Sequence, residues 1–267
     1  MILLLIVWVI AIVIFIFMIL WLYLKRKIHQ ELSINRKRYL DITSIKYPTD
    51  FNNNYFNREV FKYLIKLLYT FNNDSDSNAV FIKYNNKKII KCVFDENEYM
   101  WIMARGTATY NELEQDIKIY PTSIEDYKCH TGFYNIYIKI KDELLALLDY
   151  SIPKKIFCLG HSLGGGLVTL AAMDLFHRYK DIVSIYIIGT PRTCNERYND
   201  FIIEKPLYNV INLSDIYVNI IPSIVPFYNY MYSHIGKLYV FDKNMYNIID
   251  NHSIVTYYEN IDKYVMI

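Results

Sequence analysis

The chain has 267 residues, a formal net charge of +2 and 53% apolar residues. This near-neutral balance gives no basic surface for a phosphate backbone, so no nucleic-acid partner is expected. The four cysteines and the histidines lack the spacing of metal ligands, so no metal or other cofactor is predicted.

The N-terminus is strongly apolar. Residues 2–24 contain no charged side chain, and Lys25-Arg26-Lys27 follows directly. As a helix this stretch would be roughly 34 Å long, enough to cross the hydrocarbon core of a bilayer. A cleaved secretory signal would need a basic start, a shorter apolar core and a small-residue cleavage site, and a buried core helix would carry a polar face. We therefore predict an uncleaved transmembrane anchor at 1–24.

Two further segments follow the predicted anchor. Residues 25–56 read as a basic juxtamembrane linker, and residues 57–267 are long enough for one α/β domain. Because the positive residues come after the span and none precedes it, the positive-inside rule places this domain on the cytoplasmic side of a single-pass protein.

Hydrophobic periodicity predicts the order of elements between 57 and 267. The first half starts with an amphipathic helix at 57–71, followed by strands at 79–84, 88–94 and 99–104 and a loop at 121–126. The second half contains helices at 132–150, 163–179 and 253–264 and strands at 156–159, 182–188, 207–213 and 237–241. This alternation is typical of an α/β domain with a mostly parallel central sheet flanked by helices.

The most specific motif is Gly160-His161-Ser162-Leu163-Gly164, which joins the predicted strand at 156–159 to the helix that follows. A strand, a sharp turn with Gly-x-Ser-x-Gly and a helix form the nucleophile elbow of serine hydrolases. The turn exposes the serine hydroxyl, and the helix N-terminus points free N–H groups at a developing oxyanion. Ser162 is therefore the predicted nucleophile.

A serine nucleophile needs a histidine base, and in this arrangement the base follows the serine in the chain. Three histidines do so: His177, His234 and His252. His177 falls on the elbow helix, far from the turn. His252 follows the last predicted strand, where the base of such enzymes normally lies. The pattern favours His252, and His234 stays as the alternative.

The base in turn needs an acid to orient it. Asp215 follows the strand at 207–213 and so belongs to the carboxyl edge of the sheet, where such folds carry their chemistry. Asp200, Asp242 and Asp250 are the rivals. Asp200 falls in a surface helix, Asp242 ends a later strand, and Asp250 is too near His252 in sequence to reach it. We therefore predict Asp215 as the acid.

Backbone donors for the oxyanion are expected at two places. One is the N–H of Leu163, the residue after the nucleophile, and the other belongs to an earlier junction between strand and loop. Arg105-Gly106-Thr107 follows the strand at 99–104 and fits that position, with Thr107 offering its N–H and its hydroxyl.

Together these segments resemble the class 3, or fungal-type, lipase family of the α/β-hydrolase superfamily. The residues that carry the resemblance are Ala104-Arg105-Gly106-Thr107 with Asp116, His130-Thr131-Gly132-Phe133-Tyr134, the elbow at 160–165, Gly189-Thr190-Pro191-Arg192 with Asn195, Asn212 to Asp215 with Pro222, Tyr232 to Gly236, and Asp250-Asn251-His252. In the family the His-x-Gly segment at 234 is not catalytic, which supports His252. Cys194 stands where the family usually has glycine, and Asn251 separates Asp250 from His252, which are often adjacent there.

The resemblance implies an α/β-hydrolase fold, preceded here by the predicted transmembrane helix. It also implies a serine ester hydrolase, a lipase that cleaves acylglycerol or phospholipid esters through an acyl-enzyme on Ser162. With the predicted anchor, this enzyme would be membrane-anchored and act at a membrane surface. A lid is expected at 107–119, with Tyr110, Leu113 and Ile117 on its apolar face. A phospholipase, lysophospholipase or thioesterase on the same scaffold remains an alternative, as does a non-catalytic binding scaffold.

Overall fold

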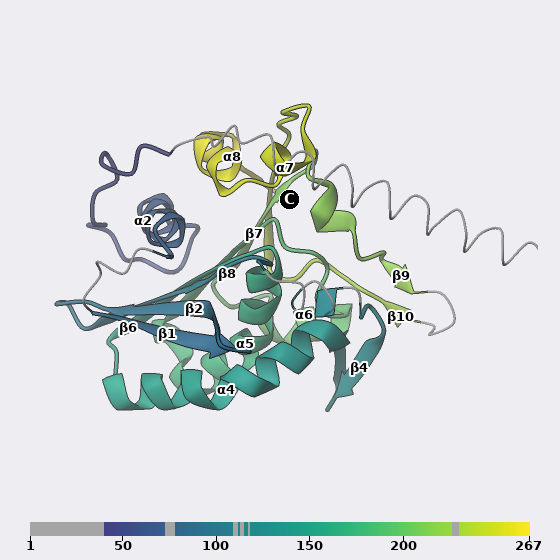
Figure 1. Ribbon diagram of the computed structural model, residues 1–267, viewed down its shortest axis with the longest axis horizontal. Coiled ribbons are helices and arrows are strands. Elements are labelled where there is room, and N and C mark those ends of the chain that lie inside the picture. Colours follow the sequence, from purple (N-terminus) through teal and green to yellow (C-terminus); the bar gives the residue numbers. More distant parts are fainter. Residues whose placement is uncertain (1–39, 73–77, 109–111, 113–114, 117, 226–229) are drawn as a thin grey trace, which may run out of the picture. The chain divides into compact units, whose positions relative to one another are not determined.

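The computed structural model describes residues 40–72, 78–108, 112, 115–116, 118–225 and 230–267. Residues 40–267 form one compact unit (Figure 1). The predicted anchor and the first part of the linker lie outside the described residues. None of the helices within those ranges is both long and apolar enough to cross a bilayer.

An eight-stranded sheet forms the centre of this unit, in the order β1-β2-β3-β6-β7-β8-β11-β12. Its strands are β1 (Ala79–Tyr84), β2 (Lys87–Phe94), β3 (Tyr99–Ala104), β6 (Lys155–His161), β7 (Val183–Ile188), β8 (Leu207–Asn212), β11 (Lys237–Phe241) and β12 (Val265–Met266). The neighbours from β3 to β11 pair in parallel, whereas β1, β2 and β12 are antiparallel additions at the two edges. The carboxyl ends of the parallel strands therefore meet at one edge, where ligands of such sheets bind.

Helices cover both faces of the sheet (Figure 1). The described α-helices are α2 (Arg58–Tyr69), α4 (Thr131–Ser151), α5 (Leu163–Tyr179), α6 (Glu196–Ile202), α7 (Ile248–Asn251) and α8 (Ile254–Glu259). The 3-10 turns are η1 (Lys180–Ile182), η2 (Ile216–Asn219) and η3 (Ile261–Lys263). Two small antiparallel pairs complete the unit: β4 (Pro121–Ile124) with β5 (Tyr127–His130), and β9 (Ile224–Val225) with β10 (Tyr230–Met231).

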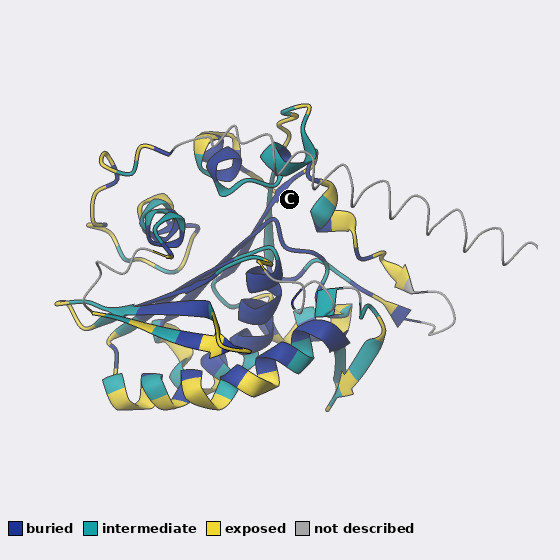
Figure 2. Cartoon of the chain, in the orientation of Figure 1, coloured by how far each residue is buried: buried dark blue, intermediate teal, exposed yellow. Residues whose placement is uncertain are grey.

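The core is split into two layers by the sheet, because successive residues of a strand point to opposite faces. In β3, Ile102 packs into the layer under α4 and α5, whereas Trp101 and Met103 pack into the layer under α2 and α8. All six residues of β7 are buried, as is typical of a central parallel strand covered on both faces (Figure 2).

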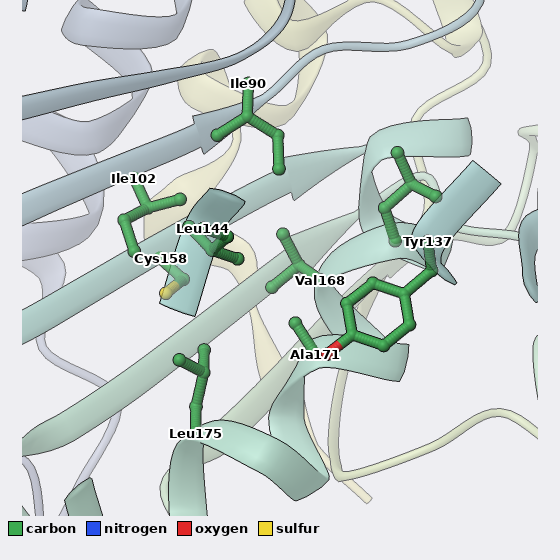
Figure 3. Close-up of a pocket in the computed structure, with 9 residues that line it drawn as sticks. Ile90, Ile102, Tyr137, Leu144, Cys158, Val168, Ala171 and Leu175 are labelled. Atoms are coloured by element: carbon green, nitrogen blue, oxygen red, sulfur yellow. The ribbon is translucent and has the colours of Figure 1, made fainter. Parts of the chain in front are cut away.

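A small gap of about 10 Å³ lies within the first layer, between the sheet and helices α4 and α5. Its lining is apolar and includes Ile102, Cys158 and Val168 (Figure 3). That volume equals roughly one water-sized sphere, and an apolar lining offers a water no partners. The gap is a packing defect of the core and does not hold a substrate.

Most of the predicted elements are confirmed within two residues, and 79–84, 99–104 and 237–241 have the predicted bounds. The loop predicted at 121–126 was wrong: residues 121–124 form β4, which pairs with β5 across a turn at Glu125 and Asp126. The terminal helix predicted at 253–264 is also wrong in length. It ends at Glu259, because the Asn260 side chain donates to the Thr256 carbonyl and competes with continued helix.

Candidate active site

Ser162 lies in the turn between β6 and α5, with a backbone φ of 57° and ψ of −124°. A positive φ is costly for a residue that has a Cβ, so the surrounding chain must hold it there. The turn packs tightly against the end of β3 because residue 164 is glycine. A Cβ on Gly164 would come within 2.1 Å of the Ala104 carbonyl oxygen. The Ser162 N–H also donates to the carbonyl of Ile188 at the end of β7, at 3.1 Å. The predicted nucleophile is thus fixed between two strand ends.

The predicted acid and base are hydrogen-bonded to each other. Nδ1 of His252 lies 2.7 Å from Oδ2 of Asp215, and the Asp215 side chain is fully buried. Asp215 caps the N-terminus of η2, and its Oδ1 accepts from the Tyr217 N–H at 2.9 Å. Its Oδ2 also accepts from the hydroxyl of Tyr257 at 2.8 Å. These bonds fix the carboxylate, and the imidazole Nε2 is left for a proton from a nucleophile.

Gly189 links the serine to this pair. It follows Ile188, the residue that accepts from the Ser162 N–H, and it has a φ of 57°. A Cβ placed on Gly189 would lie 3.1 Å from both Cε1 and Nδ1 of His252 and 3.3 Å from Oδ2 of Asp215. The backbone at the end of β7 therefore contacts all three parts of the site, and a side chain there would displace the base.

The imidazole of His252 lies near two other rings. Its centroid is 4.6 Å from that of His161 and 4.4 Å from that of Tyr217, both tilted by 37°. His161 Nε2 donates to the backbone carbonyl of His252 at 2.8 Å. Burial, together with the neighbouring His252, lowers the pKa of His161 to about 3. His161 is therefore neutral at pH 7 and adds no positive charge beside His252.

The predicted oxyanion segment also lies at the elbow. A Cβ on Gly106 would come 3.1 Å from Cβ of Ser162, so the backbone after β3 passes close to the nucleophile. Leu163 is the first residue of α5, where backbone N–H groups have no acceptor within the helix. The hydroxyl of Thr107 donates to Oδ2 of Asp116 at 2.6 Å, so in this arrangement it does not donate to an oxyanion. This leaves the N–H of Thr107 as the group to face an oxyanion.

Ionic and hydrogen-bonding contacts hold the start of the predicted lid in place. Arg105 forms an ion pair at 2.8 Å with the buried Glu112, which also accepts from the Ala108 N–H at 2.7 Å. Asp116 is partly buried, and its desolvation raises its pKa to about 7, while the bond from Thr107 opposes this rise and Glu112 adds to it. The residues predicted for the apolar face of the lid, Tyr110, Leu113 and Ile117, lie outside the described residues.

The rival residues do not join this cluster. His234 is partly buried, and its Nδ1 is buried without a hydrogen-bond partner; desolvation, reinforced by Arg192, lowers its pKa to about 4. His177 is exposed on α5, and Asp200 is exposed on α6. The carboxylate of Asp242 accepts from the hydroxyl of Ser214 at 2.6 Å. The structure thus joins His252 to Asp215 by a hydrogen bond, and the backbone of Ile188 and Gly189 links Ser162 to this pair.

Four neighbours of this cluster were not assigned a role from the sequence: Gly189, Tyr217, His161 and Tyr257. Gly189 was part of the family resemblance, and His161 occupies the variable position of the elbow motif, but neither pattern shows a contact with His252. Tyr257 lies five residues after the base on α8, and Tyr217 lies two after the acid on η2. Tyrosine is common in this chain, which has 27 of them, so no sequence signal distinguishes Tyr217 and Tyr257 from the other tyrosines.

Residues 101–226 match the model of the family described as Lipase (class 3). The resemblance to class 3 lipases predicted from the sequence is confirmed. The matched residues include the elbow of this lipase-like chain and Asp215, and they end before His252.

Two curated relatives are lipases. A lipase of Rhizomucor miehei is 28% identical over 165 residues, which are 57% of this chain and 43% of the relative. A secreted mono- and diacylglycerol lipase of Malassezia restricta is 32% identical over 93 residues, which are 33% of this chain and 31% of the relative. The chain therefore spans less than half the length of these lipases.

Solved lipase structures share the fold. The triacylglyceride lipase of Rhizomucor miehei superimposes with a TM-score of 0.52 and 22% identity, over 68% of this chain and 78% of the other. A lipase from Rhizopus microsporus var. chinensis gives a TM-score of 0.52 and 18% identity, over 76% of this chain and 84% of the other. The unit at 40–267 therefore has an α/β-hydrolase-like fold, with the mostly parallel sheet predicted from the sequence.

Proposed function

We propose that the protein is a serine ester hydrolase that acts on lipid esters, with Ser162, His252 and Asp215 as its catalytic triad. The observation that carries the proposal is the 2.7 Å bond between His252 Nδ1 and the buried Asp215 carboxylate, next to a serine held at a φ of 57°. Nucleophilic catalysis by serine requires a base that an acid orients, and the strained backbone of Ser162 supports its assignment as the nucleophile of that base.

The chemistry follows from these positions. Oγ of Ser162 attacks the ester carbonyl while Nε2 of His252 takes its proton, and Asp215 stabilises the imidazolium. The N–H groups of Thr107 and Leu163 stabilise the negative charge on the carbonyl oxygen. His252 passes the proton to the departing alcohol, leaving an acyl-enzyme. Water then repeats the same steps with the acyl group and releases a carboxylic acid.

The surroundings of the triad support an apolar, lipid-like substrate. The sequence from 216 to 236 contains no Asp, Glu, Lys or Arg. Within it Ile216, Ile220 and Ile224 expose half or more of their surface. Large exposed apolar side chains close to a site are typical of surfaces that contact lipid. The names of the curated relatives, among them a mono- and diacylglycerol lipase, favour acylglycerols over phospholipids and thioesters.

We also propose that residues 1–24 anchor the protein in a bilayer with residues 57–267 on the cytoplasmic side. The uncharged stretch at 2–24 and the basic residues that follow it support this topology. Extraction of membranes at alkaline pH tests the anchor: an integral protein stays in the pellet, whereas release into the supernatant contradicts it. Protease added to sealed vesicles of known orientation tests the topology: residues 57–267 should be digested only when the cytoplasmic face of the membrane is outside.

Hydrolysis assays on the full chain in detergent micelles test the activity. We expect turnover of mono- and diacylglycerols, and a loss on the order of 10³-fold or more in Ser162→Ala and His252→Ala. His234→Ala is the matched control, because this partly buried histidine lies outside the proposed triad; its activity per folded molecule should stay near that of the wild type. A folded wild type that cleaves neither acylglycerols, phospholipids nor thioesters would contradict the proposal and favour a binding scaffold.

A further inference from the structure

Two of the four cysteines face each other across a backbone pair outside the proposed active site. Cys129, in β5, and Cys194, in the segment after β7, are antiparallel partners. The His130 N–H donates to the Thr193 carbonyl at 2.8 Å, and the Asn195 N–H donates to the Lys128 carbonyl at 3.1 Å. These two hydrogen bonds flank the cysteines, and the backbones of Cys129 and Cys194 form no hydrogen bond with each other. The cysteines therefore occupy a narrow, non-hydrogen-bonded position of the antiparallel pair.

That geometry suits a covalent bond. At such a site the Cα atoms lie roughly 4.5 Å apart and both side chains leave the same face. A disulfide needs Cα atoms about 4.4–6.8 Å apart, so the backbone already meets this requirement without moving. Both residues are reduced and fully buried here. We propose that Cys129 and Cys194 form a disulfide-bonding site, which a small disulfide such as glutathione disulfide oxidises.

The other two cysteines provide an internal contrast. Cys92 in β2 and Cys158 in β6 are both register partners of Ile102 in β3. They lie on either side of that strand, and two steps of about 4.8 Å separate them by roughly 10 Å. This exceeds the limit of about 7 Å for a bridge without backbone movement. Cys92 and Cys158 therefore do not form a bridge with each other in this fold, whereas Cys129 and Cys194 face each other directly.

Burial controls when the bond forms. It raises the pKa of the Cys129 thiol to about 12 and that of Cys194 well above the ordinary value. The thiolate is the reacting species, so the packed pair reacts slowly at neutral pH. The bond forms when the pair is transiently open or while the chain folds. One thiolate attacks glutathione disulfide and releases glutathione; the second cysteine then displaces the other glutathione, so two thiols are oxidised and one disulfide is reduced.

The bond would join two segments that border the site. Cys129 immediately precedes His130, whose Nδ1 accepts from the Phe133 N–H at the start of α4. Cys194 lies in the segment that begins at Gly189, beside His252. Closing the long loop from 129 to 194 restricts the unfolded chain, so we expect the thermal midpoint to rise by roughly 5–10 °C.

Refolding of the full chain from urea with glutathione disulfide present tests the site without requiring access to the folded core. The protein is then alkylated, digested with trypsin without reductant and examined by mass spectrometry. The expected product joins peptide 129–139 to peptide 193–197, while the peptides with Cys92 and Cys158 are alkylated. Cys129→Ala and Cys194→Ala should lose the linked peptide and the rise in thermal midpoint, and Cys92→Ala should keep both.

Two results would overturn the proposal. One is a refolded protein of native circular dichroism in which Cys129 and Cys194 are both alkylated. The other is a bridge that involves Cys92 or Cys158 as often as the proposed pair. Neither result bears on ester hydrolysis, so the disulfide site and the proposed function stand or fall separately.

Discussion

The hydroxyl of Tyr257 donates to Oδ2 of Asp215, the same oxygen that His252 Nδ1 contacts. It also accepts from the Asn212 N–H at 3.3 Å, in a fully buried position. A carboxylate oxygen with two donors is held in one orientation, and so is the imidazole bonded to it. Tyr257 is therefore a positioning residue for the proposed triad.

Tyr257→Phe should leave the fold intact and lower kcat by about 10-fold, since a hydrogen bond to a charged group contributes about 1.5–3 kcal/mol. The measurement is acylglycerol hydrolysis per folded molecule. Tyr264→Phe is the control, because the Tyr264 hydroxyl donates to the Tyr257 carbonyl and does not touch Asp215. It should cost stability with kcat unchanged; equal losses of kcat in both variants would assign Tyr257 a structural role only.

Gly189→Ala should reduce activity more than stability. The new Cβ would press on the His252 ring at 3.1 Å, and the φ of 57° disfavours any residue with a Cβ by roughly 1–2 kcal/mol. We expect a fall in kcat of at least about 10-fold, as displacement of the base by a fraction of an ångström lengthens the proton transfer. Gly236→Ala, at a φ of 85° and against Leu207, is the control: its loss should appear in the unfolding midpoint and not in kcat.

The contact between the rings of Tyr217 and His252 gives a prediction that does not depend on the Tyr217 hydroxyl. The centroid of the Tyr217 ring lies 4.4 Å from that of His252, and an aromatic pair contributes about 0.5–1.5 kcal/mol beyond area burial. Tyr217→Leu should therefore lower kcat by about 2- to 10-fold, while Tyr217→Phe, which keeps the ring, should restore most of it. Activities that follow the loss of the hydroxyl instead of the ring would contradict this stacking role.

Asp116 gives a prediction about pH and stability. Its folded pKa is about 7, against 3.8 for an ordinary aspartate, so the carboxyl loses its proton first in the unfolded state as pH rises. The contribution of Asp116 to the free energy of unfolding is therefore fully present below pH 4 and is lost as pH approaches and passes 7, by on the order of a few kcal/mol.

Urea unfolding between pH 4 and 8 checks this. Asp116→Asn, which keeps an oxygen for the Thr107 hydroxyl, should be more stable than the wild type at pH 8, and the difference should shrink toward pH 4. Asp126→Asn, on the exposed turn between β4 and β5, is the control and should follow the wild-type curve. A constant difference across this range would show that the Asp116 carboxylate is not desolvated.

The mostly parallel sheet could be predicted from the sequence, and the three residues of the proposed triad could be selected from it, because their signals are local. The elbow at Ser162 is a contiguous motif, and Asp215 and His252 each follow a strand or its loop in the order that the fold requires. The hairpin of β4 and β5 was missed because each strand has only four residues, too few to establish an alternating pattern.

The contacts around His252 could not be predicted for a different reason. The Tyr217 ring and Gly189 lie beside His252, and Tyr257 donates to Asp215. These three residues belong to η2, to the segment after β7 and to α8, which are far apart in the sequence. The pair of Cys129 and Cys194 is likewise 65 residues apart in sequence, and a backbone pairing outside the regular strands aligns them. Periodicity reports which face of an element is buried and carries no information on such partners.

The most direct test of the proposed triad is covalent labelling of the full chain with a fluorophosphonate, which traps an activated serine. With the chain in detergent, we predict one modified tryptic peptide, 156–178, which contains Ser162. The label should be absent in Ser162→Ala and strongly reduced in His252→Ala, and it should persist in His234→Ala. Labelling that survives in His252→Ala but is lost in His234→Ala, or a folded wild type that takes no label, would contradict the account.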